Sequence, residues 1–293
     1  MKKLLLLLSI IVLGVSSINA QSSTVKIHPL PEKLYFAGEE VPINLGYVRE
    51  AIDREILTTC CMHTRTMLTL RAMSRYFPVI EPILKEYGIP DDFKYLAMAE
   101  SGLDPNAYSP AKAAGMWQFI PSAADTYALE TGSNTDLRYH VEKSTRAACV
   151  YLKSAYKRFG SWTLAAASYN AGQAGVSRRM TAQGVNDYWD LYLPEETMRY
   201  VPRILSFKVI CAAPEKFNFE LKESDKFKPF QNYKVVKVSK SNIDWSKFAA
   251  EHGTTYRQLR ILNPWIRSYE YANGGNTEYE VMIPTAEFKK KGY

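Results

Sequence analysis

Hydrophobic side chains along the chain recur mostly at spacings of three and four, a pattern typical of helices with one buried face. From Tyr47 to Ser74 this spacing is continuous, so the sequence predicts one unbroken helical stretch there. Pro78 and Pro82 are predicted to open the next helix, because proline is tolerated in a first helical turn. Gly88 is predicted to end that helix.

The middle of the chain is predicted to alternate between helices and one loop. Asp91 and Asp92 are expected to cap a short apolar helix that ends at Glu100. Residues 104–121 contain three prolines, which predicts a loop and therefore a natural place for a cleft. Further helices are predicted from residue 122 to about 132, over 142–159 and over 195–213, and the small apolar residues 162–170 are expected to pack tightly in the centre.

The pattern changes after residue 213. Residues 214–230 mix Lys, Glu and Phe without a period, so we expect a linker. Strand, helix, helix and strand are then predicted over 233–238, 244–253, 255–263 and 279–284. We therefore predict a mainly α domain over 46–213 and a small α+β (βααβ) domain over 231–293, with an extended lead-in over 21–45.

The first twenty residues have the features of a secretory signal peptide. Lys2 and Lys3 precede an apolar run from Leu4 to Val15, and small residues lead to a cleavage point that we place after Ala20. The alternative is a membrane anchor, but the run is shorter than the roughly 20 residues a span needs. We expect an exported protein without a stable membrane span after cleavage, periplasmic in a two-membrane bacterium.

The charge of the chain bears on its partners. The formal net charge is +7, and +5 without the two lysines of the signal peptide. A basic exported protein is attracted to an anionic polymer, for which cell wall qualifies and nucleic acid does not. The alternative is that a net charge of +5 is ordinary variation among proteins and indicates no partner.

Cysteine and histidine usage limits the chemistry further. An oxidising location would allow one bridge from Cys60 or Cys61 to Cys149 or Cys211, and buried free thiols are the alternative. The four histidines are scattered and show no metal-ligand spacing, so we expect no metal and no cofactor.

The candidate chemistry centres on Glu100. A carboxyl at the end of an apolar helix can keep its proton near neutral pH, because burial disfavours the charged form. Cleavage of a glycosidic bond requires such an acid. Glu100 belongs to the first of four sequence blocks, which span residues 95–102, 115–121, 168–172 and 196–202.

In this order and spacing, the four blocks resemble the catalytic SLT domain of lytic transglycosylases, the lysozyme-like enzymes that cut the glycan strands of peptidoglycan. The resemblance, to the membrane-bound lytic transglycosylase D type in particular, covers about residues 45–212. Residues 231–285 resemble a LysM module, although the turn at 241–245 and the long loop at 264–278 depart from its usual pattern. A module that binds glycan would raise the local substrate concentration.

The resemblance implies that Glu100 acts alone, first as acid and then as base. The product would be 1,6-anhydro-N-acetylmuramic acid, released from its β-1,4 bond to N-acetylglucosamine without water. Met116 is expected to line the cleft while Trp117 packs in the core. The full set of residues expected to bind substrate is Ser101, Met116, Gln118, Tyr169, Asn170 and Tyr200.

Specific roles are expected for three of these residues. The Ser101 hydroxyl would bond to Glu100 or the sugar, and the Tyr200 phenol would fix the Glu100 rotamer. Asn170 would hold the N-acetyl group or orient the acid. For Ser101 and Tyr200, an ordinary structural role is the alternative.

Two other functions are consistent with the sequence. A hydrolytic muramidase on the same scaffold would need a second carboxylate, for which Asp104 is the nearest candidate, although Asp before Pro105 commonly initiates a turn. A non-catalytic peptidoglycan-binding protein is the other, but a binding protein has no need of a buried acid.

Overall fold

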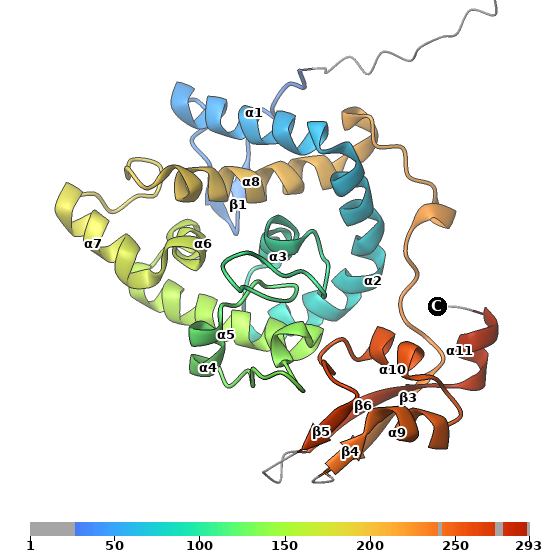
Figure 1. Cartoon of the computed structure of the whole chain (residues 1–293). Helices are drawn as coiled ribbons and strands as arrows, with labels where there is room; N and C mark the ends of the chain where they lie inside the picture. The colour runs from blue at the N-terminus through green and yellow to red at the C-terminus, as the bar shows by residue number, and fades with distance from the viewer. Residues whose placement is uncertain (1–26, 240–241, 273–277, 292–293) are drawn as a thin grey trace, which may run out of the picture.

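The computed structural model describes residues 27–239, 242–272 and 278–291. Figure 1 shows a large helical domain followed by a small domain of strands and helices, as the sequence predicts. The expected signal peptide lies outside the described residues. Within the described residues, every helix is too short or too polar to cross a membrane.

The two long N-terminal helices differ from their prediction. α1 (Gly46–Cys61) and α2 (His63–Tyr87) are separated at Met62, whose ψ of 46° is not helical. Pro78 and Pro82 lie inside α2 and do not open a new helix. The apolar face of α2 continues through both prolines, so tertiary packing outweighs the local cost of a missing N–H. Gly88 ends α2 in the left-handed conformation, as predicted.

The short helix α3 (Lys94–Ser101) lies in the middle of the domain. In Figure 1 it is surrounded by α1, α2, α5 (Val141–Phe159), α6 (Trp162–Ala171) and α8 (Glu195–Ala212). Leu96, Ala97 and Met98 of α3 have no exposed surface. Two helices differ from prediction: α4 (Pro121–Thr126) ends early, and α7 (Gln173–Gln183) was not predicted.

The lead-in to the helical domain is a packed hairpin and not simply an extended chain. Two short strands, β1 (Tyr35–Phe36) and β2 (Glu39–Glu40), pair antiparallel. The Glu39 carboxylate accepts hydrogen bonds from the Trp162 and Thr163 N–H groups at the start of α6. This is a favourable place for a negative charge, because the first N–H groups of a helix lack partners within it.

The aspartates before α3 also bind outside their own helix. Asp91 and Asp92 begin a 3-10 turn and do not cap it with their side chains. The Asp92 carboxylate accepts hydrogen bonds from the Ala37 N–H and the Lys208 ammonium, each at 2.7 Å. The predicted cap is therefore wrong, and Asp92 instead joins α3 to the hairpin and to α8.

The C-terminal domain has the predicted order of strand, two helices and strand. β3 (Tyr233–Val238) and β6 (Tyr279–Pro284) pair antiparallel, and α9 (Trp245–Glu251) and α10 (Tyr256–Leu262) lie between them in sequence. A second pair of strands, β4 (Asn242–Asp244) and β5 (Glu270–Ala272), occupies the segments that depart from the usual LysM pattern. A final helix, α11, spans Ala286–Lys291.

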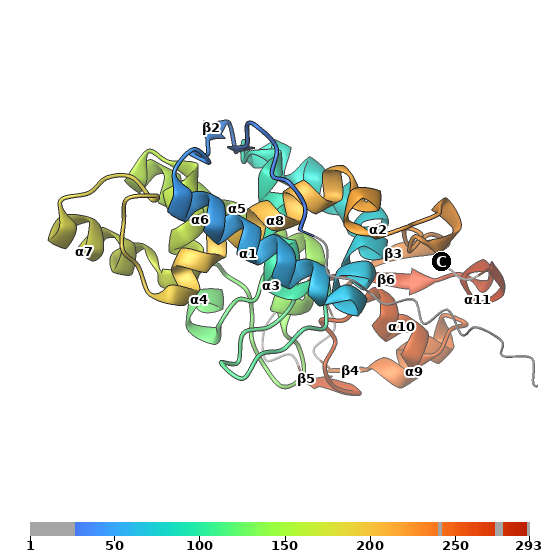
Figure 2. The same cartoon turned by 90° about the horizontal axis from the view of Figure 1, so that it is seen from above.

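The segment between the domains is held against α2. Residues 214–230 contain 3-10 turns at Pro214–Phe217 and Glu223–Asp225. Arg71 of α2 donates a hydrogen bond to the Asp225 carbonyl at 2.6 Å and lies over the Phe227 ring. In Figures 1 and 2 the C-terminal domain and α7 lie at opposite ends of the molecule.

The cysteines are unbridged, but they are not all buried as the alternative to a disulfide expected. Cys60, Cys61, Cys149 and Cys211 are all free thiols. Cys149 is buried in α5, and the Cys211 sulfur lies 3.6 Å from the Met73 sulfur.

Candidate active site

A cleft of about 870 Å³ opens beside α3. Its walls come from helices α1 to α6, from α8 and from the loop over residues 104–120, so segments far apart in sequence form one site. The predicted site residues that line it are Glu100, Gln118, Tyr169, Asn170 and Tyr200.

Glu100 lies in the last turn of α3, partly buried at the edge of the cleft. The helix stops directly after it because Gly102 adopts the left-handed conformation, with φ of 68°. A side chain at position 102 would also be strained, since a Cβ atom would lie 2.8 Å from the Thr69 hydroxyl. The turn therefore fixes where the Glu100 side chain enters the cleft.

The Tyr200 phenol donates a short hydrogen bond to Oε1 of Glu100. Tyr200 is itself buried, on the face of α8 that packs against α3. Burial beside Glu100 holds the pKa of Tyr200 well above its usual value, so the phenol stays neutral and keeps its proton to donate. The other carboxyl oxygen of Glu100 is thus the one that can carry an acidic proton.

The Glu100 carboxyl has the pKa expected of a general acid. Burial raises its pKa to about 7, which outweighs the opposing effects of the Tyr200 hydrogen bond and the Arg203 charge. Near neutral pH a large fraction of the protein therefore carries a protonated Glu100.

Gln118 is held in an unusual backbone conformation within the loop of residues 104–120. Its φ is 50°, which lies in a region of backbone conformation that residues other than glycine seldom adopt. Its side-chain amide donates to the Gly115 carbonyl at 2.8 Å. Such strain persists only where the surrounding structure enforces it, and it is common at functional sites.

Two predicted site residues do not line the cleft. Met116 is 1% exposed and packs in the core, so the expectation that it lines the cleft is wrong. Ser101 donates to the Met116 carbonyl at 2.8 Å and not to Glu100. Ser101 therefore holds the loop against α3. Trp117 is buried as expected, and its indole donates to the Thr145 hydroxyl at 2.8 Å.

Tyr169 and Asn170 lie near the end of α6. The Tyr169 phenol donates to the Trp117 carbonyl at 2.8 Å and so supports the loop that carries Gln118. The Thr197 hydroxyl donates to Oδ1 of Asn170 at 2.8 Å. Since its carbonyl oxygen is occupied, Asn170 can offer its amide N–H₂ group to a ligand.

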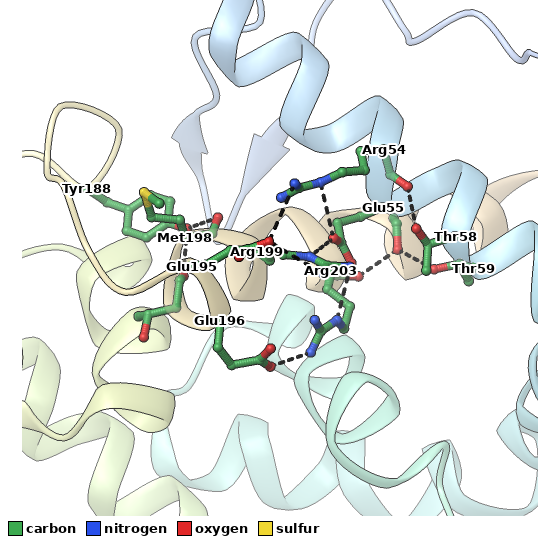
Figure 3. A network of polar contacts seen from close by, with 12 residues as sticks. Arg54, Glu55, Thr58, Thr59, Tyr188, Glu195, Glu196, Met198, Arg199 and Arg203 are labelled. Carbon is green, nitrogen blue, oxygen red and sulfur yellow. Dashed lines mark hydrogen bonds and ion pairs between the residues drawn. The ribbon is translucent and has the colours of Figure 1, made fainter.

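A charged network along the cleft was not found by sequence reasoning. Figure 3 shows Arg199 and Arg203 of α8 converging on Glu55 of α1, at 2.6 Å and 3.3 Å. Glu55 is only 1% exposed. Arg203 also pairs with Glu196 at 2.8 Å. In the sequence this network is visible only as a glutamate at position 55 on the apolar face of α1 and as two arginines, Arg199 and Arg203, one turn apart in α8.

The carboxylates near the cleft have different environments. Asp104 accepts a hydrogen bond from the Asn106 N–H at 2.8 Å, which fits the turn that its sequence predicted, and it does not line the cleft. Glu55 and Glu196 do line it, but each is paired with arginine. Glu100 is bound instead by a neutral phenol.

Both domains match known sequence families. Residues 78–191 match the family described as the transglycosylase SLT domain, and residues 234–287 match the soluble lytic transglycosylase C-terminal LysM-like domain. The chain therefore contains an SLT domain followed by a LysM-like domain, which confirms both resemblances seen in the sequence.

Among full-length relatives, the chain is 31% identical over 257 residues to the membrane-bound lytic murein transglycosylase D of Escherichia coli strain K12. That alignment covers 85% of this chain and 55% of the relative, so the chain spans about half the length of that protein. Two solved structures, each 18% identical, are similar over part of their length. The 70 kDa soluble lytic transglycosylase of Escherichia coli gives a TM-score of 0.42 over 62% of this chain and 32% of its own. The lytic transglycosylase Slt of Pseudomonas aeruginosa gives 0.39 over 64% and 37%.

Proposed function

We propose that this protein is an exported peptidoglycan lytic transglycosylase with Glu100 as its single acid and base. The observation that carries the proposal is a carboxyl with a pKa raised to about 7, in a cleft, held on one oxygen by a neutral tyrosine. The SLT family match and the relative named above support the same reaction and substrate.

In the proposed reaction, Glu100 first gives its proton to the oxygen that links N-acetylmuramic acid to N-acetylglucosamine. The bond from C1 to that oxygen breaks, and Glu100 is left as a carboxylate. It then removes the proton of the C6 hydroxyl of the same muramic acid, whose oxygen bonds to C1. The product is a 1,6-anhydro sugar, Glu100 is protonated again, and no water is consumed.

The other cleft residues would bind and orient the sugar. The Asn170 amide N–H₂ group suits the carbonyl oxygen of an N-acetyl group. Gln118 and Tyr169 lie along the same cleft as Glu100. The Arg203 guanidinium, which lowers the pKa of Glu100, would favour the carboxylate that forms when the bond breaks.

The deciding experiment is mass spectrometry of the soluble products after the purified mature protein digests peptidoglycan. Products ending in 1,6-anhydro-N-acetylmuramic acid would establish the transglycosylase reaction. Reducing ends would instead show a hydrolase, for which Glu196 is the cleft carboxylate to examine, because it is exposed beside the site.

The Glu100→Gln variant tests the assigned residue. It should fold and bind wall but lose turnover by roughly 10³-fold or more, because the amide cannot donate a proton as an acid does. Glu251→Gln, an exposed change in the C-terminal domain, is the matched control. Near-normal turnover by Glu100→Gln would contradict the mechanism.

Export and periplasmic location belong to the same proposal. They rest on the charged and apolar start of the sequence and on the wall as substrate. N-terminal sequencing of the protein from fractionated cells should find a mature chain that begins after Ala20.

A further inference from the structure

A segment of the helical domain, with isolated β-bridges and a 3-10 turn over Leu137–Tyr139, lies between the cleft and the C-terminal domain. We call residues 130–140 the strap. On its outer side, the Asp136 N–H donates to the Trp265 carbonyl at 3.0 Å. The Arg267 N–H donates to the Asn134 carbonyl at 2.8 Å. The C-terminal domain is thus joined to the strap by backbone hydrogen bonds, as neighbouring strands are.

Side chains reinforce this contact. The Arg267 guanidinium lies 3.9 Å from the centre of the Tyr139 ring. The Tyr279 phenol donates to the Glu130 carboxylate. Trp265, 2% exposed, is stacked nearly parallel to the ring of His140. Buried aromatic and cation–ring contacts of this kind favour a fixed arrangement of the two domains over a loose tether.

On its inner side, the strap holds one wall of the cleft. Arg138 is 6% exposed, and its Nη1 donates to the Lys112 carbonyl at 2.7 Å and the Phe119 carbonyl at 3.0 Å. These carbonyls belong to the loop that supplies Gln118 to the cleft. Because one planar guanidinium bonds to both ends of the turn, its position fixes the shape of the turn.

Asp136 connects the two sides. Its carboxylate pairs with Arg138 at 2.7 Å, while its own N–H is bonded to Trp265. The fit is tight, since a Cβ atom on Gly115 would lie 1.8 Å from the Arg138 carbonyl oxygen. A shift of the strap by even a fraction of an ångström must therefore move the loop with it.

We infer that the LysM-like domain is a fixed part of the catalytic unit and positions the cleft wall through Asp136 and Arg138. This inference rests on the proposed function and adds a role to it. A domain that only tethers the enzyme to wall would raise the local substrate concentration and leave the cleft unchanged. A positioning domain affects turnover of small soluble substrates, for which tethering has no benefit.

The test compares two double variants of the full mature chain on a soluble, uncross-linked glycan fragment. Arg267→Met with Tyr279→Phe removes two of the three side-chain contacts to the strap and leaves the stack of Trp265 on His140. Arg257→Met with Tyr269→Phe makes the same changes at exposed positions of the domain. Hydrogen exchange of residues 107–120 and 130–140 is measured beside kcat and KM.

For the first double variant we expect faster exchange in both segments and a fall of about tenfold in kcat/KM, because small misplacements of binding groups reduce rates strongly. The control should match the wild type. Unchanged exchange over residues 107–120 or unchanged kcat/KM in the strap variant would overturn the inference. Absence of anhydro products from the wild type would overturn the proposed function instead, and the exchange data would still decide whether the domains are coupled.

A second variant covers the case in which the first fails to fold. Arg138→Lys keeps a charge beside Asp136 but cannot bond to two carbonyls as a planar fork does. We expect an unchanged pH profile, since Glu100 is untouched, with a lower kcat/KM on the same soluble fragment. Wild-type kinetics in Arg138→Lys would contradict the positioning role.

Discussion

At the scale of single residues, the proposed function of the Glu100 carboxyl comes with a cost in stability. Its pKa is about 7 in the folded protein and near the ordinary glutamate value in the unfolded chain. A group whose folded pKa is raised contributes its full stability at low pH and loses it as the pH rises through that folded pKa. Ionised Glu100 therefore destabilises the fold at neutral and alkaline pH.

We predict that Glu100→Gln is more stable than the wild type above pH 7, by roughly 1–3 kcal/mol, because the amide needs no deprotonation. The difference should vanish below about pH 4.5, where the unfolded wild type is also protonated. Urea unfolding at pH 4 and pH 8 measures both values. A variant less stable than the wild type at pH 8 would contradict the assigned burial of the charge.

Tyr200→Phe should change the pH dependence of turnover in a defined direction. The phenol lowers the pKa of Glu100, so its removal should raise that pKa and move the alkaline fall of kcat to higher pH. We also expect kcat to fall by roughly 10-fold to 100-fold, because the carboxyl loses its fixed orientation. Tyr188→Phe is the control, since Tyr188 is bound to the Thr197 and Met198 carbonyls.

Residue patterns in the sequence found most of this site but not all of it. Glu100, Gln118 and Asn170 belong to sequence blocks whose order could be read directly. Met116 could not be assigned, because neighbours in a loop point in directions that only the φ of each residue decides. The pairing of Glu55 with Arg203 spans 148 positions, and no local pattern reports such a contact.

At the scale of elements, the start of α6 depends on a charge from another part of the chain. Glu39 in β2 accepts hydrogen bonds from two N–H groups and from the hydroxyls of Ser161 and Thr163. α6 carries Tyr169 and Asn170 at its other end. The hairpin therefore stabilises the helix that delivers two cleft residues.

Glu39→Gln should lower the free energy of unfolding by about 1–2 kcal/mol, because a neutral amide binds a helix N-terminus more weakly than a carboxylate does. Glu40→Gln, on the exposed side of the same strand, should change it by less than about 0.5 kcal/mol. Urea unfolding of the two variants at pH 7 provides the comparison. Equal losses would show that the Glu39 contact is not what stabilises α6.

Helix boundaries were less predictable than helix existence. The sequence predicted α5 and α8 nearly to the residue, since a glycine or a proline lies at or near an end of each. It failed at Pro78, where burial of the neighbouring side chains overrides a local signal. α7 was missed because Val176 is its only buried residue, so it has little apolar periodicity to detect.

At the scale of the whole molecule, His140 makes the contact between the domains sensitive to pH. Burial, with the Lys143 charge, lowers its pKa to about 4. Because the folded pKa lies below the unfolded value near 6.5, the neutral ring is favoured in the fold. The associated stability is present above pH 6.5 and is lost as the pH falls toward 4.

We predict that the wild type loses about 2 kcal/mol of stability between pH 7 and pH 5 from this one group. His140→Phe preserves an aromatic ring against Trp265 and removes the titration. Glu100 titrates equally in both proteins, so the wild type should lose about 2 kcal/mol relative to His140→Phe between pH 7 and pH 5, as measured by urea unfolding at each pH. A difference between the two proteins that does not change with pH would contradict the assignment to His140.

The packing of α8 against α1 and α3 has a consequence for how this protein can be divided or inherited. The segment that matches the SLT family, residues 78–191, includes Glu100 and Asn170 but ends before Tyr200. A gene fragment with those boundaries would encode the acid without the phenol that orients it. Recombination that preserves the proposed site must therefore transfer α8, and α1 that packs against it, together with the matched segment. The heritable unit is then larger than the segment that the family match covers.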